Sequence, residues 1–191
     1  MLVLIAGLIV FLGVHLMRVL ADDWRSAQIE RHGEKAWKLA YTAVSLVGFA
    51  LILWGFHLAR MNPIVLWPRI PGMNHLAALL VLLAFVLLAA AYVPRNSFKA
   101  RFGHPMVLSV KFWALAHLLA NNTLADLLLF GGFLAWAVLC FISLRRRDRA
   151  AGAVPPASTV AGTALTIVTG AVAWAVFAFW LHAWLIGVQP I

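Results

Sequence analysis

Five apolar runs dominate the sequence, and each is long enough to cross a lipid bilayer. They cover Met1–Leu20, Leu39–Ala59, Leu76–Val93, Leu124–Leu144 and Val160–Ile186. About 20 helical residues span the roughly 30 Å of hydrocarbon, in which every backbone polar group must be satisfied within the protein. A sixth run, Met106–Ala120, is shorter and amphipathic. The sequence therefore predicts an all-α, polytopic transmembrane helix bundle of about six helices, forming a single domain over residues 1–191.

The composition agrees with a chain that is surrounded by lipid. Hydrophobic residues make up 64% of the sequence and charged residues 11%, whereas soluble domains carry about 25% charged residues. The net charge of +9 comes from basic residues that flank the apolar runs, so we expect membrane lipid as a partner and no nucleic acid. The single cysteine, Cys140, excludes an intrachain disulfide and a site of several thiolates.

Basic residues are distributed unevenly between the two sides of the membrane. With the N-terminus outside, the cytoplasmic loops carry eleven Lys and Arg residues, and the outer loops carry only Arg60 and Arg69. Short cytoplasmic loops are enriched in Lys and Arg, and this bias sets the orientation of membrane proteins. We therefore predict that both termini face the exterior, most naturally from a bacterial inner membrane.

Histidines are the main candidates for chemistry, because six of the seven lie in or at the edge of apolar runs. Ionisable side chains inside a membrane are costly and usually functional. These histidines are His15, His57, His75, His104, His117 and His182. We expect His57 and His75 at the membrane interfaces, and His182 in an aromatic belt near the outer surface. The alternative for His182 is a second haem ligand or a contact with a quinone.

His117 lies in the segment with the most polar side chains per residue. At about 100° per residue, it shares a helix face with Val110, Trp113 and Asn121. A neutral imidazole has one donor and one acceptor nitrogen, and the acceptor is the atom that ligates haem iron. The alternative is a hydrogen bond to a facing helix, which stabilises the bundle without any cofactor.

His15 is the natural partner of His117 on a second helix. Its side chain is too short to reach the interface, and Arg18 follows one turn later. Arg18 either extends to the interface with Asp22 as its counter-ion or meets an anionic group such as a haem propionate. Two histidines on separate helices are able to clamp one haem iron from opposite faces.

The depths of these two histidines in the membrane differ in this arrangement. His117 is expected about 16 Å from the cytoplasmic side and His15 about 8 Å. The difference closes if the first helix continues past Asp22 and Asp23, and the proline-free stretch Trp24–Lys38 allows such an extension.

Segments along the whole chain resemble one family of membrane proteins. The segments are FLGVH at 11–15, AAYVPRNSFKARFGHPM at 90–106, WALAHLLANN at 113–122, FGGFLAWAV at 130–138 and WLHAWLIGV at 180–188. In this order they resemble the NnrU family, which is associated with denitrification and nitrogen-oxide metabolism. The resemblance implies an integral membrane protein whose partner is nitric oxide or a hydrophobic small molecule.

The NnrU family in turn resembles plant zeta-carotene isomerase, a membrane enzyme that uses haem b. Two histidines implicated as axial ligands in that enzyme resemble His15 and His117, so the resemblance implies haem b bound between the first and fourth helices. Arg18, Trp113 and Asn121 are expected around this cofactor. The cysteine of the isomerase motif corresponds to Ala114 here. The resemblance therefore implies haem binding more strongly than it implies carotenoid isomerisation. A haem-binding protein of this kind would be an isomerase-like enzyme, an oxidoreductase or a gas-responsive factor.

Two other functions compete with a haem protein. The ARFGHPM segment at 100–106 resembles the Arg-His-Pro motif of isoprenylcysteine-type membrane methyltransferases, which bind S-adenosylmethionine; alternatively, Pro105 simply begins a helix. A haem-free transporter or assembly factor would instead line a polar path with the buried histidines, Arg18 and Lys111. The sequence has no P-loop, no dinucleotide-binding glycine pattern and no clustered carboxylates, which argues against ATP hydrolysis, nicotinamide chemistry and a di-iron centre.

Overall fold

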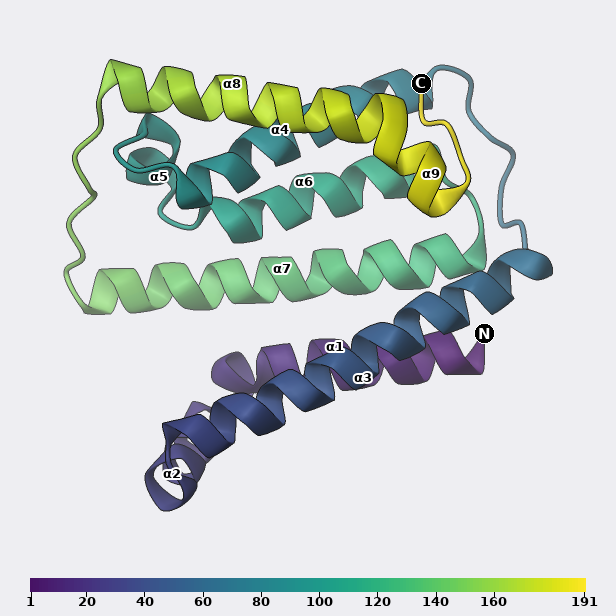
Figure 1. The fold of residues 1–191 in the computed structure, drawn as a ribbon. Helices are drawn as coiled ribbons and strands as arrows, with labels where there is room; N and C mark the ends of the chain where they lie inside the picture. The colour runs from purple at the N-terminus through teal and green to yellow at the C-terminus, as the bar shows by residue number, and fades with distance from the viewer. The chain divides into compact units, whose positions relative to one another are not determined.

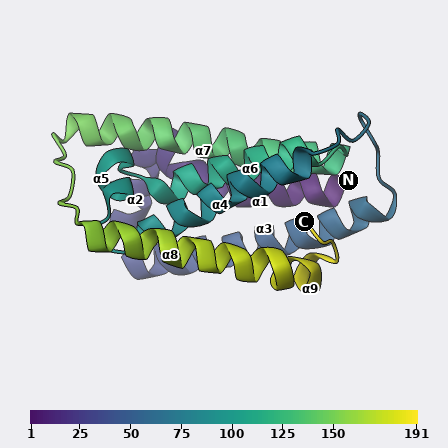
Figure 2. The same cartoon turned by 90° about the horizontal axis from the view of Figure 1, so that it is seen from above.

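A computed structural model describes residues 1–191, and most of the chain is helical (Figures 1 and 2). The elements are α1 (Leu2–Leu20), α2 (Asp22–His32), α3 (Glu34–Met61), α4 (Met73–Tyr92), α5 (Ser97–Phe102), α6 (Pro105–Ala120), α7 (Leu124–Ala150), α8 (Val160–Val176), the π-helical turn η1 (Phe177–Leu181) and α9 (His182–Ile186). An isolated bridge between Val65 and Thr123 is the one extended pairing. The predicted all-α fold is confirmed.

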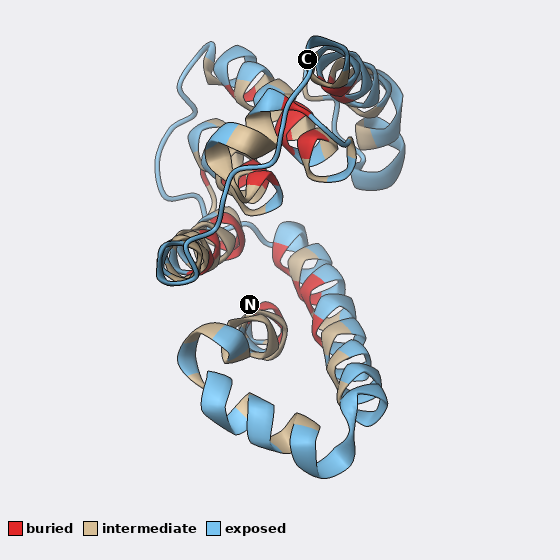
Figure 3. Ribbon diagram, turned by 90° about the vertical axis from the view of Figure 1, so that its left-hand side faces the viewer, coloured by how far each residue is buried: buried red, intermediate tan, exposed pale blue.

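Five spans are long and apolar enough to cross a membrane: α1, α3, α4, α7 and the continuous stretch Val160–Ile186. Between 17% and 28% of the residues in these spans are buried, so most of their apolar surface faces outward. On α3, Leu46, Phe49 and Trp54 are exposed, whereas the buried residues lie along one side of the helix (Figure 3). A surface of this kind is solvated by lipid, and the protein is an integral membrane protein.

The first compact unit comprises residues 1–68 and 122–140. Within it, α1 and α3 approach closely because glycines lie at their interface. A Cβ atom added to Gly7 would lie 2.6 Å from the backbone nitrogen of Ile52, and one added to Gly48 would lie 2.7 Å from that of Phe11. Small residues permit this backbone approach in membrane helices, where van der Waals packing drives association. The pairing holds the part of α1 that carries His15.

The segment after α3 is tied to the start of α7. The Leu66 amide donates to the Asn122 carbonyl at 2.9 Å, and the Leu124 amide donates to the Ile64 carbonyl at 2.9 Å. The Asn122 side chain donates to the Trp67 carbonyl at 2.7 Å. These bonds satisfy backbone groups of an irregular segment that follows a membrane span.

The second compact unit comprises residues 69–121 and 141–191. Here α4 packs against both α6 and α8. A Cβ atom on Gly170 would lie 2.5 Å from the Val86 Cα, and one on Gly162 would lie 2.8 Å from the Pro94 carbonyl oxygen. The contact of Gly162, early in α8, is made just after the end of α4, and the contact of Gly170, later in α8, is made within α4. The two helices are therefore antiparallel (Figure 1). The same register places the start of α4 level with the end of the Val160–Ile186 stretch.

The continuation of the first helix past Asp22 and Asp23, which would bring His15 and His117 to the same depth, does not occur. Helix α1 ends at Leu20, and Ala21 leaves the helical conformation with φ −144° and ψ 46°. Asp22 and Asp23 then form the first turn of α2, where acidic side chains interact favourably with the helix dipole. The two aspartates therefore begin a separate helix.

The boundaries of two other spans also differ from the prediction. Helix α3 begins at Glu34, five residues before the predicted Leu39. Its first turn is held by an ion pair between Glu34 and Lys38 at 2.9 Å, a spacing that supports exposed helical turns. The last span contains the π-helical turn η1, which an apolar run does not reveal because every residue in it is apolar.

Candidate functional site

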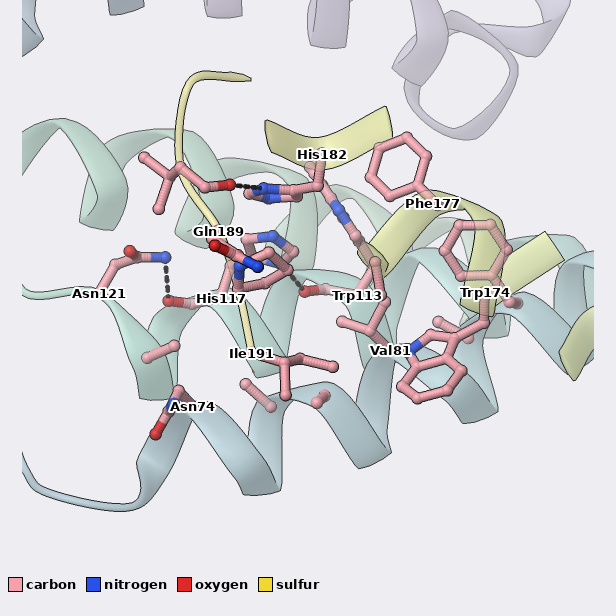
Figure 4. A pocket seen from close by; sticks show the side chains of 18 of the residues that line it. Asn74, Val81, Trp113, His117, Asn121, Trp174, Phe177, His182, Gln189 and Ile191 are labelled. Carbon is pink, nitrogen blue, oxygen red and sulfur yellow. Dashed lines mark hydrogen bonds between the residues drawn. The ribbon is translucent and has the colours of Figure 1, made fainter. Parts of the chain in front are cut away.

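A pocket of about 660 Å³ lies within the second unit, between α4, α6, the end of α8, and α9 with the residues that follow it (Figure 4). Helix α6 contributes Val110, Trp113, His117 and Asn121 to its wall. These are the residues that the helical periodicity of the sequence places on one face, at steps of three and four. Pockets of this size hold small-molecule ligands.

The ring of His117 is oriented by its own helix. Its Nδ1 atom lies 2.8 Å from the Trp113 carbonyl oxygen, and because a carbonyl only accepts, Nδ1 carries the proton and Nε2 is the acceptor. The Trp113 ring lies 5.2 Å from the imidazole, centroid to centroid. An Nδ1–H bonded to a backbone carbonyl is the usual outer-shell contact of a metal-ligating histidine.

The side chain of Asn121 forms a hydrogen bond at the C-terminal end of the same helix. Its side-chain amide donates to the His117 carbonyl at 2.9 Å, and the residue also lines the pocket. The same carbonyl also accepts the backbone N–H of Asn121 at 3.0 Å, so the side chain adds a second hydrogen bond at the C-terminal end of α6. Asn121 therefore has a structural role at the site in addition to its place on the pocket wall.

His182 also lines this pocket, although the sequence alone favoured an interfacial position in an aromatic belt. Its Nδ1 atom lies 2.6 Å from the Val188 carbonyl oxygen, so Nε2 is again the acceptor of the ring. The chain reaches Val188 by a reversal at Gly187, whose φ is 75°, a conformation that glycine adopts without strain. Figure 4 shows His182 on the last helical segment and His117 on α6 among the side chains of one pocket.

The π-helical turn determines the direction in which the His182 side chain points from the last span. Residues five apart in an α-helix are about 140° apart around its axis, but a π-helix closes one turn with an i to i+5 bond. The His182 amide donates to the Phe177 carbonyl in this way, and the two rings lie 5.8 Å apart. Phe177 and His182 consequently face the same pocket. In the sequence, the spacing of Trp174, Ala178 and His182 at intervals of four residues could have indicated that these three pocket residues lie on one side of the last span.

His15 lies in the first unit, in a cluster of aromatic rings. Its Nδ1 atom lies 2.6 Å from the Phe11 carbonyl oxygen, so Nε2 is the acceptor here too. The imidazole stacks on Phe11 at 4.2 Å and lies 5.2 Å from the Tyr41 ring and 6.1 Å from the Trp136 ring. The buried indole N–H of Trp136 has no hydrogen-bond partner. A donor of this kind next to a histidine calls for an acceptor from outside the chain.

Three other polar side chains that the sequence analysis considered are Arg18, Asp22 and Lys111. Arg18 lies in the last turn of α1, and Asp22, on α2, pairs with Arg25 at 3.5 Å. The Lys111 ammonium lies 4.6 Å from the centre of the Phe141 ring, a cation–π contact. No group of three or more His, Cys, Asp or Glu side chains is arranged to hold a bare metal ion.

His104 precedes Pro105, which begins α6 in the first-turn position that suits proline. Its Nε2 atom lies 2.8 Å from an Asp148 carboxylate oxygen. Arg145 lies 3.8 Å from the same oxygen. These contacts join the start of α6 to the end of α7 within the second unit, and they give His104 a structural role.

Comparison with known proteins identifies one family. The family described as "NnrU protein" matches residues 3–190, nearly the whole chain. No curated protein and no solved structure matches the chain.

Proposed function

Because the chain belongs to the NnrU family, we propose that it is a haem b-binding protein of the bacterial inner membrane that acts in nitrogen-oxide metabolism, with His15 and His117 as iron ligands. Haem b supplies redox and gas-binding chemistry at its iron when it is bound. The partner in this proposal is nitric oxide or a lipid-soluble substrate.

The observation that carries the proposal is the shared state of the two imidazoles. His15 donates its Nδ1–H to the Phe11 carbonyl, and His117 donates its Nδ1–H to the Trp113 carbonyl, each four residues earlier in its own helix. In both rings this bond turns the Nε2 lone pair away from the helix backbone. Each bond therefore favours the tautomer in which Nε2 carries no proton, which is the form that ligates iron.

The surroundings of both histidines suit a flat, largely apolar cofactor. His15 is surrounded by Phe11, Tyr41 and Trp136, and His117 is accompanied by Trp113. Aromatic side chains present broad apolar faces to a ring system. The indole N–H of Trp136, which lacks an acceptor in the chain, would donate to a polar atom of the bound group. The donor set therefore fits haem b.

The test is the absorption spectrum of the detergent-purified protein, produced with ample haem, in its oxidised and reduced states. We expect a low-spin Soret spectrum in the parent protein, and a high-spin spectrum or loss of the band in both His15→Ala and His117→Ala. His57→Ala is the matched control, because His57 is exposed on α3 and its removal should leave the spectrum unchanged.

Absence of a Soret band from folded, haem-supplied protein would refute the proposal and leave a haem-free transporter or assembly factor as the function. A spectrum that changes in only one of the two variants would show that the iron has one histidine ligand. Circular dichroism of each variant separates loss of the cofactor from loss of the fold.

A further inference from the structure

The pocket of the second unit is long and narrow. On α4 its wall extends from Asn74 to Leu88, and on α6 from Ser109 to Asn121. At 1.5 Å per residue, the first of these distances is about 21 Å. A volume of about 660 Å³ over that length corresponds to a mean cross-section of about 30 Å². This shape admits one extended hydrocarbon chain lengthwise.

Polar side chains are concentrated at one end of this pocket. Since α4 is antiparallel to α6 and to α8 (Figure 1), the start of α4 lies beside the ends of α6 and α9. The residues with polar side chains at that end are Arg69, Asn74, His117, Asn121, His182 and Gln189. The other end is lined by residues such as Phe85, Leu88 and Trp174. Its one hydroxyl, on Ser109, donates to the Met106 carbonyl of the same helix.

Both ends together define an amphipathic ligand with a compact polar head and a single apolar tail. At the polar end, the Nε2 atom of His182 is an acceptor, because Nδ1 donates to Val188. Arg69, Asn74 and Gln189, which line the same end, have side chains with N–H donors. The complementary head group therefore carries both a hydroxyl donor and an oxygen acceptor. Trp113 and Phe177, which also line the pocket, offer aromatic faces to a flat ring.

We propose that this pocket binds a prenyl quinol, with its ring between α4, α6 and α9, one hydroxyl donating to His182 Nε2, and its tail extending along α4 towards Leu88. The site takes the redox-active lipid of the membrane as its ligand. The inference goes beyond the proposed function and shares one residue with it: His117 lines the same pocket, so the quinol ring lies against the imidazole that we assign to the iron.

The experiment compares a quinol with its quinone, because only the quinol carries the hydroxyl donor. Binding of decylubiquinol, kept reduced under anaerobic conditions, and of decylubiquinone is titrated into the detergent-solubilised protein. His182→Ala should weaken quinol binding about two- to tenfold, the effect of one hydrogen bond, and leave quinone binding within twofold. Val81→Phe, which narrows the pocket midway along α4, should weaken both. His57→Ala should change neither.

Equal effects of His182→Ala on quinol and quinone, or no effect on either, would overturn the assignment of the hydroxyl to His182. Unchanged binding in Val81→Phe would place the ligand outside the pocket. Solvent extraction of the purified protein gives an independent measurement: about one quinone per chain supports the proposal, whereas phospholipid or fatty acid alone refutes it.

The Soret band is recorded on the same samples. It should be retained in His182→Ala, which also shows that the variant is folded. Quinol binding without a Soret band would refute the proposed haem function and leave the quinol site standing. A Soret band without quinol binding would refute the quinol site and leave the proposed haem function standing.

Discussion

The close approach of α8 to α4 at Gly170 gives the sharpest test of how the second unit is built. In Gly170→Ala, the new Cβ atom would lie 2.5 Å from the Val86 Cα, 2.8 Å from its amide nitrogen and 2.9 Å from its Cγ2. Ordinary van der Waals contact begins at 3.4 Å, so the two helices must separate locally by about 0.9 Å. Two of the three obstructing atoms are backbone atoms, which no rotamer change moves.

The free energy of unfolding should fall because the separation weakens packing along the α4–α8 interface. A gap of 0.5 to 1 Å already removes about a quarter to a half of the dispersion energy of each contact, and overpacking a tight interface typically costs about 1 to 3 kcal/mol. We expect Gly170→Ala to destabilise the protein by about 2 kcal/mol, even though alanine favours a helix by about 1 kcal/mol over glycine.

The assay is equilibrium unfolding in mixed detergent micelles, followed by tryptophan fluorescence. Gly13→Ala is the matched control, since an added Cβ on Gly13 of α1 meets nothing within 4 Å and should leave stability unchanged or slightly raised. A Gly170→Ala protein as stable as the parent would refute the packing that we describe. Equal destabilisation by the two substitutions would show that the effect comes from the backbone and not from the interface.

Three further predictions use the same unfolding measurement. Asn96→Ala should cost about 2 to 4 kcal/mol, because this side chain, 1% exposed, donates to two backbone carbonyls and caps α5; a cost below about 1 kcal/mol would contradict that role. Asp148→Asn should cost at most about 1 kcal/mol and less at high salt, since its contact with His104 is part-exposed; a larger, salt-independent loss would argue against this account. Gly55→Leu should abolish the pairing of α1 with α3, because its Cβ would clash with the backbone of Leu4, and a stable, folded variant would disprove that interface.

The spans and their order followed from hydrophobicity, because lipid leaves the backbone little choice except a helix. Apart from the end residues Met1 and Val93, every residue of the predicted apolar runs is helical, and Pro105 begins α6 as its fixed φ favours. The shared face of Val110, Trp113, His117 and Asn121 could also be predicted, since helical periodicity alone places them together.

Helix breaks inside favourable sequence could not be predicted in this way. Nothing in the residues around Ala21 forbids a helix, yet the backbone turns there and separates α1 from α2. The start of α3 at Glu34 could not be predicted from hydrophobicity either, because the charged residues of its exposed first turn give no apolar signal.

The sequence by itself determined an all-helical membrane protein, the positions of its spans and the helix faces that carry His15 and His117. Only the tertiary structure decided that His182 lies in the same pocket as His117. That outcome depends on an extra residue in the turn at Phe177–Leu181, on the reversal at Gly187 and on the antiparallel register of α4 and α8. Hydrophobicity predicts none of these three features, because it measures how much apolar surface a segment has and not which side chains from distant segments are in contact.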